Sequence, residues 1–294
     1  MMVYQPIKIG DSSFLDIRGK KYHLKIWGQP DAPKLFYLHG WADTGTTFQF
    51  VIDAMQSNWQ VIAIDWRGFG KTEHQNSCYW FPDYLADLDL ILEAYSPDEA
   101  VTLIGHSMGA NVASLYAGIK PERVNRLINI EGFGLSDSDP NNAPVTYRRW
   151  LEKQESTPKF NGYLSYDELV PRITKRSPTM KLDRAAFVAK EWAYEDSDGH
   201  VSLRADPYHK LPNAIQYRRS EAEACWNNIT ARTIFIWGEH TNFNKEMDLM
   251  RNMTSANHPF TKAEIVCIKN TGHMIHFENP ESLAAVLEDF LFSN

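Results

Sequence analysis

Ser107 lies in the segment 105–109, which reads GHSMG and is a Gly-x-Ser-x-Gly motif. The apolar residues before it, AVTLI, are typical of a buried strand, and the residues after it, ANVASLYAGIK, are typical of a helix. Two glycines allow a tight turn between strand and helix, which would expose the serine hydroxyl at the helix N-terminus. In this context the motif predicts a nucleophilic serine rather than a glycine turn with an incidental serine.

A serine hydroxyl becomes a useful nucleophile when a base takes its proton and a third group orients that base. His273, within the segment NTGHMIH, follows the last predicted strand and is the predicted base. His276 is its rival, and we expect it to lie partly buried beside the site. His39 and His106 flank the site, each next to a glycine turn, and packing beneath these turns is their expected role.

The chain has 294 residues, of which 43% are hydrophobic, enough for one large domain or a domain with an insertion. A net charge of −7 without a basic cluster argues against nucleic acids and anionic membranes as partners. Three cysteines without a C-x-x-C pair argue against a disulfide framework or zinc ribbon. We expect no metal or cofactor, no membrane insertion, a cytoplasmic location, and a monomer or homodimer.

The apolar pattern predicts an α/β fold with a mostly parallel, doubly wound sheet. Two antiparallel strands near the N-terminus would form one edge of this sheet. The expected strands cover residues 12–17, 21–28, 33–39, 59–65, 100–105, 126–131, 233–238 and 263–269. The expected helices cover residues 48–57, 82–96, about 13 residues after the serine, 245–253 and 280–292.

Residues 136–226 interrupt this alternation with polar turns and amphipathic stretches, and they show no buried strand. They predict a mostly helical insertion. The expected organisation is a first core part at 1–135, the insertion at 136–226 and a second core part at 227–294.

Several segments match, in order, those of the α/β-hydrolase fold superfamily, which the chain resembles. They are HGW at 39–41, DWRGFG at 65–70, GHSMG at 105–109, WGE at 237–239 and GH at 272–273. HGWAD and the insertion segments YRR, ADPYHK and IQYRRSEAEACW are similar to the serine-hydrolase-like or Kraken-type group. The resemblance implies that the insertion is a lid. It also implies an oxyanion hole, with the backbone N–H of Trp41 joining that of Met108, the residue after the nucleophile.

The third member of the triad departs from the commonest pattern of the superfamily. Its acid lies a few residues past WGE in many members, where this chain has Thr241, which carries no charge. Glu131 ends the strand after the nucleophile helix, a placement that resembles the haloalkane-dehalogenase branch. We predict Glu131 as the acid, with Glu239 and Asp248 as alternatives, and we expect Thr241→Ala to do little.

These residues predict a hydrolase that cleaves small carboxylic esters through an acyl-enzyme on Ser107, with His273 as base and Glu131 as acid. An apolar acyl or alcohol part of the substrate would contact Trp41, Trp150 and Trp192. Two alternatives use the same residues. One is a ligand receptor or signalling protein with slow hydrolysis, and the other is a carbon–carbon bond hydrolase.

Overall fold

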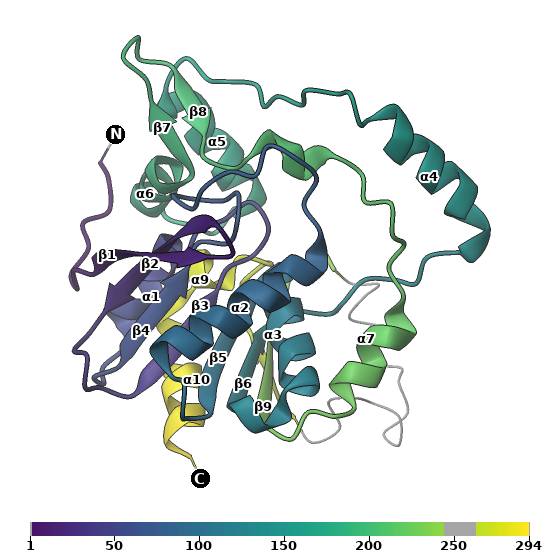
Figure 1. The fold of residues 1–294 in the computed structure, drawn as a ribbon. Helices are drawn as coiled ribbons and strands as arrows, with labels where there is room; N and C mark the ends of the chain where they lie inside the picture. Colours follow the sequence, from purple (N-terminus) through teal and green to yellow (C-terminus); the bar gives the residue numbers. More distant parts are fainter. Residues whose placement is uncertain (1, 244–262, 294) are drawn as a thin grey trace.

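The computed structural model describes residues 2–243 and 263–293 (Figure 1). The strands of the main sheet are β1 (Asp11–Ile17), β2 (Lys20–Trp27), β3 (Lys34–Leu38), β4 (Gln60–Ile64), β5 (Val101–His106), β6 (Val124–Ile130), β9 (Arg232–Gly238) and β10 (Glu264–Ile268). Within the described residues they form an eight-stranded sheet in the order β1-β2-β4-β3-β5-β6-β9-β10.

The six strands from β4 to β10 in this order pair in parallel, whereas β2 is antiparallel to both β1 and β4. The predicted sheet and its antiparallel edge are confirmed. The chain goes from β3 outward to β4 and then returns to β5 on the other side of β3. Ligands of open α/β sheets bind beyond the carboxyl ends of the strands at such a reversal. The segment after β3 and Ser107 after β5 therefore lie where a site is expected.

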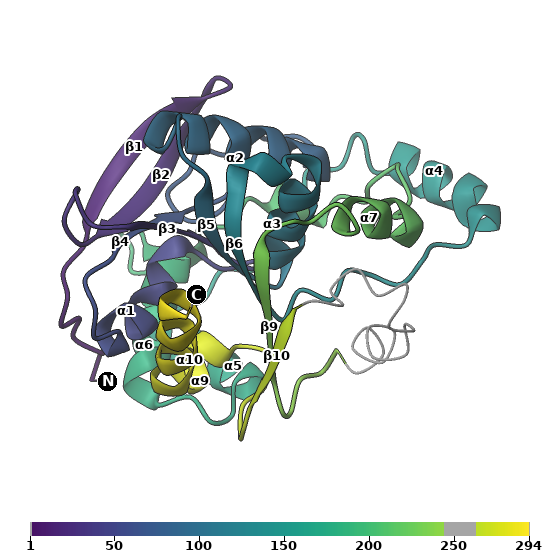
Figure 2. The ribbon, with the colours of Figure 1, turned by 90° about the horizontal axis from the view of Figure 1, so that it is seen from below.

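Helices cover both faces of the sheet (Figure 2). On one face lie α2 (Phe81–Tyr95), α3 (Met108–Ile119) and α7 (Arg219–Trp226), and on the other α1 (Gln49–Ala54) and α10 (Pro280–Phe292). Each layer of helices buries its own apolar cluster against the sheet, with Leu88 and Val112 in the first and Val51 and Leu287 in the second. This two-sided burial explains why the parallel strands are almost continuously apolar.

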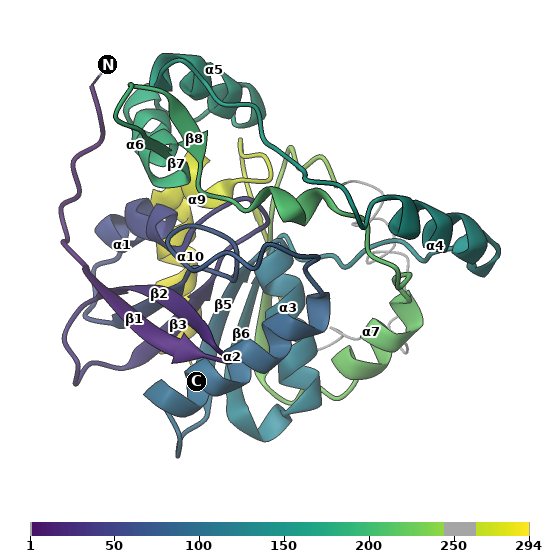
Figure 3. The same ribbon diagram turned by 45° about the horizontal axis from the view of Figure 1, so that its top comes forward.

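The segment 136–226 contains α4 (Ala143–Glu152), α5 (Tyr166–Arg176), α6 (Leu182–Trp192), β7 (Ala193–Glu195), β8 (Val201–Leu203) and then α7. Helices α5 and α6 pack together in a third apolar cluster that includes Leu169 and Val188. Helix α4 buries none of its residues and projects to the side (Figures 1 and 3). At the end of the segment, α7 packs against α3, and Trp226 joins the cluster on that face.

Residues 136–226 contain a short hairpin that the sequence did not predict, although neither of its strands is buried along its length. Strands β7 and β8 form an antiparallel hairpin in which Val201 is fully buried. Its turn is closed by Asp196 Oδ1, which accepts hydrogen bonds from the amides of Asp198 and His200, and Gly199 takes a positive φ of 84°. Local side-chain bonds of this kind favour a turn over continuation of the preceding helix.

Two smaller differences concern helices. The helix expected at 48–57 is shorter, because a 3₁₀ turn at Gly45–Phe48 precedes α1 and the backbone becomes extended at Met55. The helix expected at 245–253 lies outside the described residues. A further short helix, α9 (Ile275–Glu278), precedes α10. None of the described helices is long and apolar enough to cross a membrane.

Candidate active site

Ser107 forms the apex of a sharp turn between β5 and α3. Its backbone has φ 52° and ψ −114°, a conformation that costs a non-glycine residue free energy and is typical of strained functional positions. The turn is held by the Ser107 amide, which donates to Ile130 O at 2.8 Å. A Cβ on Gly109 would lie 2.1 Å from Leu38 O, and one on Gly105 would lie 2.4 Å from Ala110 Cα. The two glycines of the motif are therefore required by close packing.

Glu131 and His273 are joined by a hydrogen bond of 2.8 Å between Glu131 Oε2 and His273 Nδ1. The carboxylate is 2% exposed, and it also accepts from the Gly238 amide at 2.6 Å through Oε1 and from Thr241 Oγ1 at 2.6 Å through Oε2. Glu131 has a positive φ of 59°, so it too is held in a sparsely populated conformation. A buried carboxylate with three donors is well suited to orient one imidazole.

Ser107 and His273 line the same cavity, which has a volume of about 1040 Å³. The imidazole of His273 is held between the rings of His106 and Phe243, at centroid distances of 4.8 and 4.5 Å. Within the described part of the chain, no hydrogen bond joins Ser107 Oγ to His273 Nε2. Such contacts are often loose in free enzymes and tighten when substrate binds.

The alternative acids occupy other surroundings. Glu239 is exposed and binds Lys269 Nζ at 2.8 Å and the Asn270 amide at 3.0 Å. Asp248 lies outside the described residues. Thr241, expected to be unimportant, is 3% exposed and donates to Glu131. The sequence does not predict this hydrogen bond to Glu131. It predicts only that Thr241 cannot replace the charge of the expected aspartate, and not that its hydroxyl acts as a donor.

The loop after β3 lies directly against the sharp turn at residues 105–109, which we call the elbow. A Cβ on Gly40 would lie 2.8 Å from His106 Nδ1 and 3.2 Å from Ser107 Cβ, so a glycine is needed for the loop to approach this closely. Trp41 follows on this loop, with its side chain 51% exposed and on the cavity wall. Met108 is the first residue of α3, and the first backbone amides of a helix have no hydrogen-bond acceptor within it. The geometry thus brings Trp41 and Met108 to the nucleophile, as an oxyanion hole requires.

A second buried polar cluster lies beside this site. Asp43 accepts from Thr47 Oγ1 at 2.8 Å and from Trp192 Nε1 at 2.7 Å, and it lies 3.1 Å from His276 Nε2. Burial opposes the charge on Asp43, but the bond to His276 and the nearby imidazoles outweigh it, so the pKa of Asp43 is lowered. His276, the rival base, is 1% exposed and bound to this carboxylate.

The cluster also includes the histidine of the elbow. His106 Nε2 lies 3.0 Å from His273 O, and burial together with His276 and His273 holds the pKa of His106 well below its usual value. A metal ion could in principle be bound by three buried side chains of the described residues whose potential ligand atoms lie within 4.8 Å of one another: Asp43, His106 and His276. Each of these side chains already makes a hydrogen bond inside the protein.

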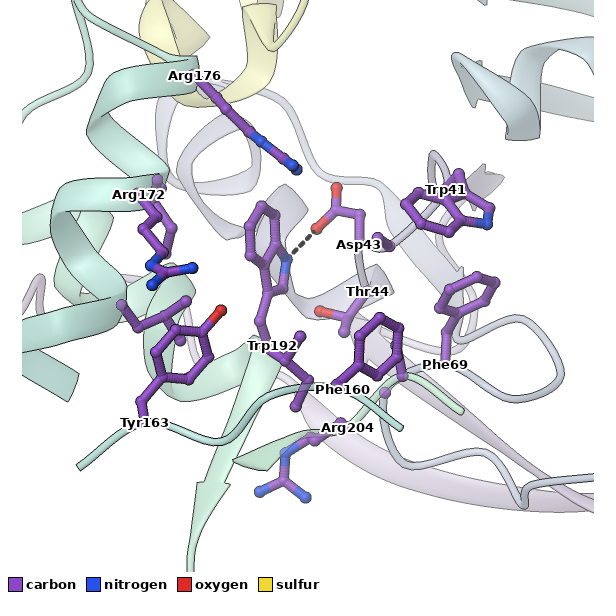
Figure 4. Close-up of a pocket in the computed structure, with 16 residues that line it drawn as sticks. Trp41, Asp43, Thr44, Phe69, Phe160, Tyr163, Arg172, Arg176, Trp192 and Arg204 are labelled. Atoms are coloured by element: carbon purple, nitrogen blue, oxygen red, sulfur yellow. Dashed lines mark hydrogen bonds between the residues drawn. The ribbon is translucent and has the colours of Figure 1, made fainter. Parts of the chain in front are cut away.

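Of the three tryptophans expected to contact substrate, Trp41 and Trp192 line the cavity of Ser107 and a smaller one of about 250 Å³ beside it. Figure 4 shows the smaller cavity, with the Trp192 indole bound to Asp43. Trp150 is not brought to the site. It lies on α4, which supplies no described lining residue to either cavity.

A model of the alpha/beta hydrolase fold family matches residues 33–280, from the residue before β3 to the start of α10. The chain belongs to the α/β-hydrolase fold family. The predicted resemblance is thereby confirmed, and hydrolysis is the chemistry that this family and the names of its similar members support.

Two relatives show how far this likeness extends. A serine hydrolase-like protein of Danio rerio is 25% identical over 276 residues, covering 91% of this chain and 84% of its own length. Serine hydrolase-like protein 2 of Homo sapiens is 22% identical, covering 91% and 89%. These names agree with the predicted resemblance to the serine-hydrolase-like group within the α/β-hydrolase fold family.

Solved structures share the fold. A thioesterase domain from the curacin biosynthetic pathway superimposes with a TM-score of 0.82 at 24% identity, covering 95% of this chain and 99% of that one. A novel esterase from Mycobacterium tuberculosis has a TM-score of 0.72 at 15% identity, with coverages of 99% and 93%. At these identities the comparison establishes the α/β-hydrolase architecture.

Proposed function

We propose that the chain is a serine hydrolase that cleaves carboxylic esters through an acyl-enzyme on Ser107. The observation that carries the proposal is the bond of His273 to the buried Glu131 carboxylate, in the wall of the cavity that Ser107 also lines. Glu131 fixes the Nδ1–H tautomer of His273, which leaves Nε2 free to take a proton. Serine, histidine and carboxylate then have the roles that acyl transfer needs.

In the first step Ser107 Oγ attacks the ester carbonyl while its proton moves to His273 Nε2. The oxyanion accepts hydrogen bonds from the Trp41 and Met108 amides, and the imidazolium is stabilised by Glu131. The intermediate collapses, the C–O bond breaks, and the alkoxide takes the proton from His273. Water then attacks the acyl-enzyme with His273 again as base, which releases the acid and restores Ser107. Alkoxides and thiolates leave more easily than amines, which favours esters.

We further propose that part of the segment 136–226 acts as a lid over this site. The cavity that Ser107 lines is also lined by Ile173 on α5 and Trp192 at the end of α6. Trp41, Phe243 and Met274 from the core give the same cavity an apolar wall. This lining supports an apolar portion in the substrate next to the scissile bond.

The proposal is tested with an ester panel of varied acyl length and a fluorophosphonate probe that labels activated serines. We expect turnover of short esters and labelling of Ser107 in the wild type, and neither in Ser107→Ala. Ser136→Ala is the matched control, because Ser136 is exposed and lies outside both cavities. A wild-type protein that hydrolyses no ester and takes no label would refute the proposed function.

A further inference from the structure

Three cationic side chains of α5 line the cavity of Ser107. Arg172, Lys175 and Arg176 follow the spacing i, i+3, i+4, which places them on one face of the helix. Leu169 and Val170 of the same helix are buried in the apolar cluster that α5 shares with α6. The helix is therefore oriented by its apolar residues so that its charged face borders the cavity.

These cations are not neutralised within the part of the chain that the structure describes. None of the three takes part in an ion pair there, whereas Arg67 and Arg184 each bind a carboxylate. Arg172 lies over the Tyr163 ring at 5.0 Å, a contact that leaves its guanidinium donors free. Like charges at this spacing repel and destabilise a helix. The position near the helix C-terminus favours Lys175 and Arg176, but Arg172 lies outside the last turn.

Carboxylates also line the cavities that these cations border, but none forms an ion pair with them within the described residues. Glu278, which lines the cavity of Ser107, accepts from the Gly272 amide at 2.9 Å and from Thr179 Oγ1 at 2.5 Å, both through Oε2, and its buried Oε1 has no hydrogen-bond partner among the described residues. Figure 4 shows Arg176 extending from the helix toward Trp192 and Asp43, and Arg172 lying beside Tyr163. Asp43 is 2% exposed and is held by its own bonds to Thr47, Trp192 and His276. A protein with a net charge of −7 thus carries three cations in the wall of the cavity that Ser107 lines.

We propose that this face of α5 binds an anionic group of the substrate, so that the preferred substrates are esters or thioesters carrying a carboxylate or phosphate away from the scissile bond. The inference rests on the proposed function and specifies its substrate class. Each guanidinium presents a planar fork of N–H donors that suits the oxygens of either anion. Both arginines line the cavity of Ser107 and the smaller one beside it.

The test uses pairs of esters that differ only in charge. Monoethyl adipate and ethyl hexanoate have equal acyl length and differ by a terminal carboxylate. A second pair, 2-phosphonooxyethyl and 2-hydroxyethyl hexanoate, places a phosphate on the alcohol instead. We expect the wild type to favour the charged member of at least one pair by about tenfold or more in kcat/KM, the scale of a charge-assisted hydrogen bond. The pair that shows the preference identifies the part of the substrate beneath α5.

The variants Arg172→Gln, Arg176→Gln and the double variant should lower the ratio of kcat/KM for the charged over the neutral ester, the double variant by about tenfold or more. Arg149→Gln is the matched control, because Arg149 is an exposed cation on α4 outside both cavities. Equal turnover of charged and neutral esters by the wild type, or an unchanged ratio in the double variant, would overturn the inference while leaving the ester hydrolase in place.

A binding measurement separates this inference from the proposed function. Adipate, the product of the charged ester, and inorganic phosphate are titrated into Ser107→Ala by calorimetry, with and without the double arginine substitution. We expect saturable binding of the favoured anion that weakens with ionic strength and is lost with the arginines. If no ester is hydrolysed but this binding is found, the function fails and the anion site stands. If neither anion binds, the anion site is refuted.

Discussion

Glu131 is the residue on which the proposed triad depends most. It is buried, has a positive φ, and is bound by His273, Thr241 and the Gly238 amide. Glu131→Gln would keep the shape of this group but replace an acceptor oxygen by an amide donor, which favours the wrong tautomer of His273. We expect kcat to fall by about 10⁴-fold with KM nearly unchanged. Steady-state kinetics on a short ester decide this, and near-normal activity of Glu131→Gln would contradict the triad.

Thr241 should matter less than Glu131 but more than the sequence predicted. Its hydroxyl donates a hydrogen bond of 2.6 Å to Glu131 Oε2, and a bond to a charged acceptor stabilises that charge. Thr241→Ala should lower kcat by about tenfold. Thr241→Ser keeps the hydroxyl, and we expect it to retain most of the activity. Equal losses in the alanine and serine variants would show that packing, and not the hydrogen bond, is responsible.

The chemistry-bearing residues were predictable to the extent that they belong to local motifs. Ser107 and His273 follow from a glycine elbow and from a histidine on the last strand's loop, and the structure brings both to one cavity. Asp43 and Thr241 were not predictable in this way, because their contacts join segments far apart in the chain. Arg172 and Arg176 were present in an amphipathic stretch, but only the fold shows which face they present to the cavity.

At the scale of elements, a hydrogen bond from Trp192 fastens the C-terminal end of α6 to the core, while Arg184 nearer its start binds Glu281 of α10. Trp192 Nε1 donates to Asp43 Oδ1 at 2.7 Å, and Asp43 follows Trp41 on the loop after β3. Trp192→Phe keeps the ring but removes the donor, so the free energy of unfolding should fall by about 1.5 kcal/mol and α6 should open more often. Hydrogen exchange of the α6 amides measures this. Trp80→Phe, at a half-exposed position, is the control and should leave that exchange unchanged.

A stacked histidine ties the segment before α7 to the core. His209, in the 3₁₀ turn Pro207–Lys210, lies between the rings of Phe69 and Tyr79, at centroid distances of 3.9 and 3.6 Å. Burial lowers the pKa of His209 from 6.5 to about 4. The unfolded chain therefore takes up this proton at a higher pH than the folded protein, and the stabilisation present above pH 6.5 is lost as the pH falls toward 4.

The free energy of unfolding should accordingly fall by about 2 kcal/mol through His209 alone between pH 7.5 and pH 5. Burial also lowers the pKa values of His39 and His106, which act in the same direction. The variant His209→Phe keeps an aromatic ring between Phe69 and Tyr79 but removes the titratable imidazole, so its free energy of unfolding should depend less on pH. Urea unfolding at both pH values measures the difference, with the exposed His200→Gln as control. An unchanged pH dependence in His209→Phe would contradict this assignment.

Elements were predicted more reliably than their placement. The strands and most helices of the core follow from apolar periodicity, because strands buried on both faces leave a continuous signal. The β7–β8 hairpin was missed because three-residue strands leave almost no periodic signal, and its stability comes from Asp196 and from burial of Val201. In the same way, the composition of α4 and α5 is similar, but one projects outward and the other borders the site.

At the scale of the whole molecule, the sheet determines where chemistry is found. The chain reverses its direction across the sheet at β3. Each site residue follows the carboxyl end of a different strand: Trp41 follows β3, Ser107 follows β5, Glu131 follows β6, Thr241 follows β9 and His273 follows β10. Alternation of strands and helices predicts the parallel, doubly wound architecture and hence the edge of the sheet on which these residues gather. The placement of α5 and α6 beside the cavity depends on packing between amphipathic helices, which sequence periodicity does not orient.

The contact between Glu131 and Thr241 also bears on how such enzymes diverge. Thr241 Oγ1 and His273 Nδ1 both lie within hydrogen-bond distance of Glu131 Oε2, so side chains from two strand ends reach the same point beside the imidazole. A lineage can therefore exchange its acid through an intermediate that carries both carboxylates, without moving the serine or the histidine. Recovery of activity in a Glu131→Gln, Thr241→Asp double variant, relative to Glu131→Gln alone, would demonstrate that route. In this chain, two substitutions would then suffice to move the acid from the end of one strand to the end of the next.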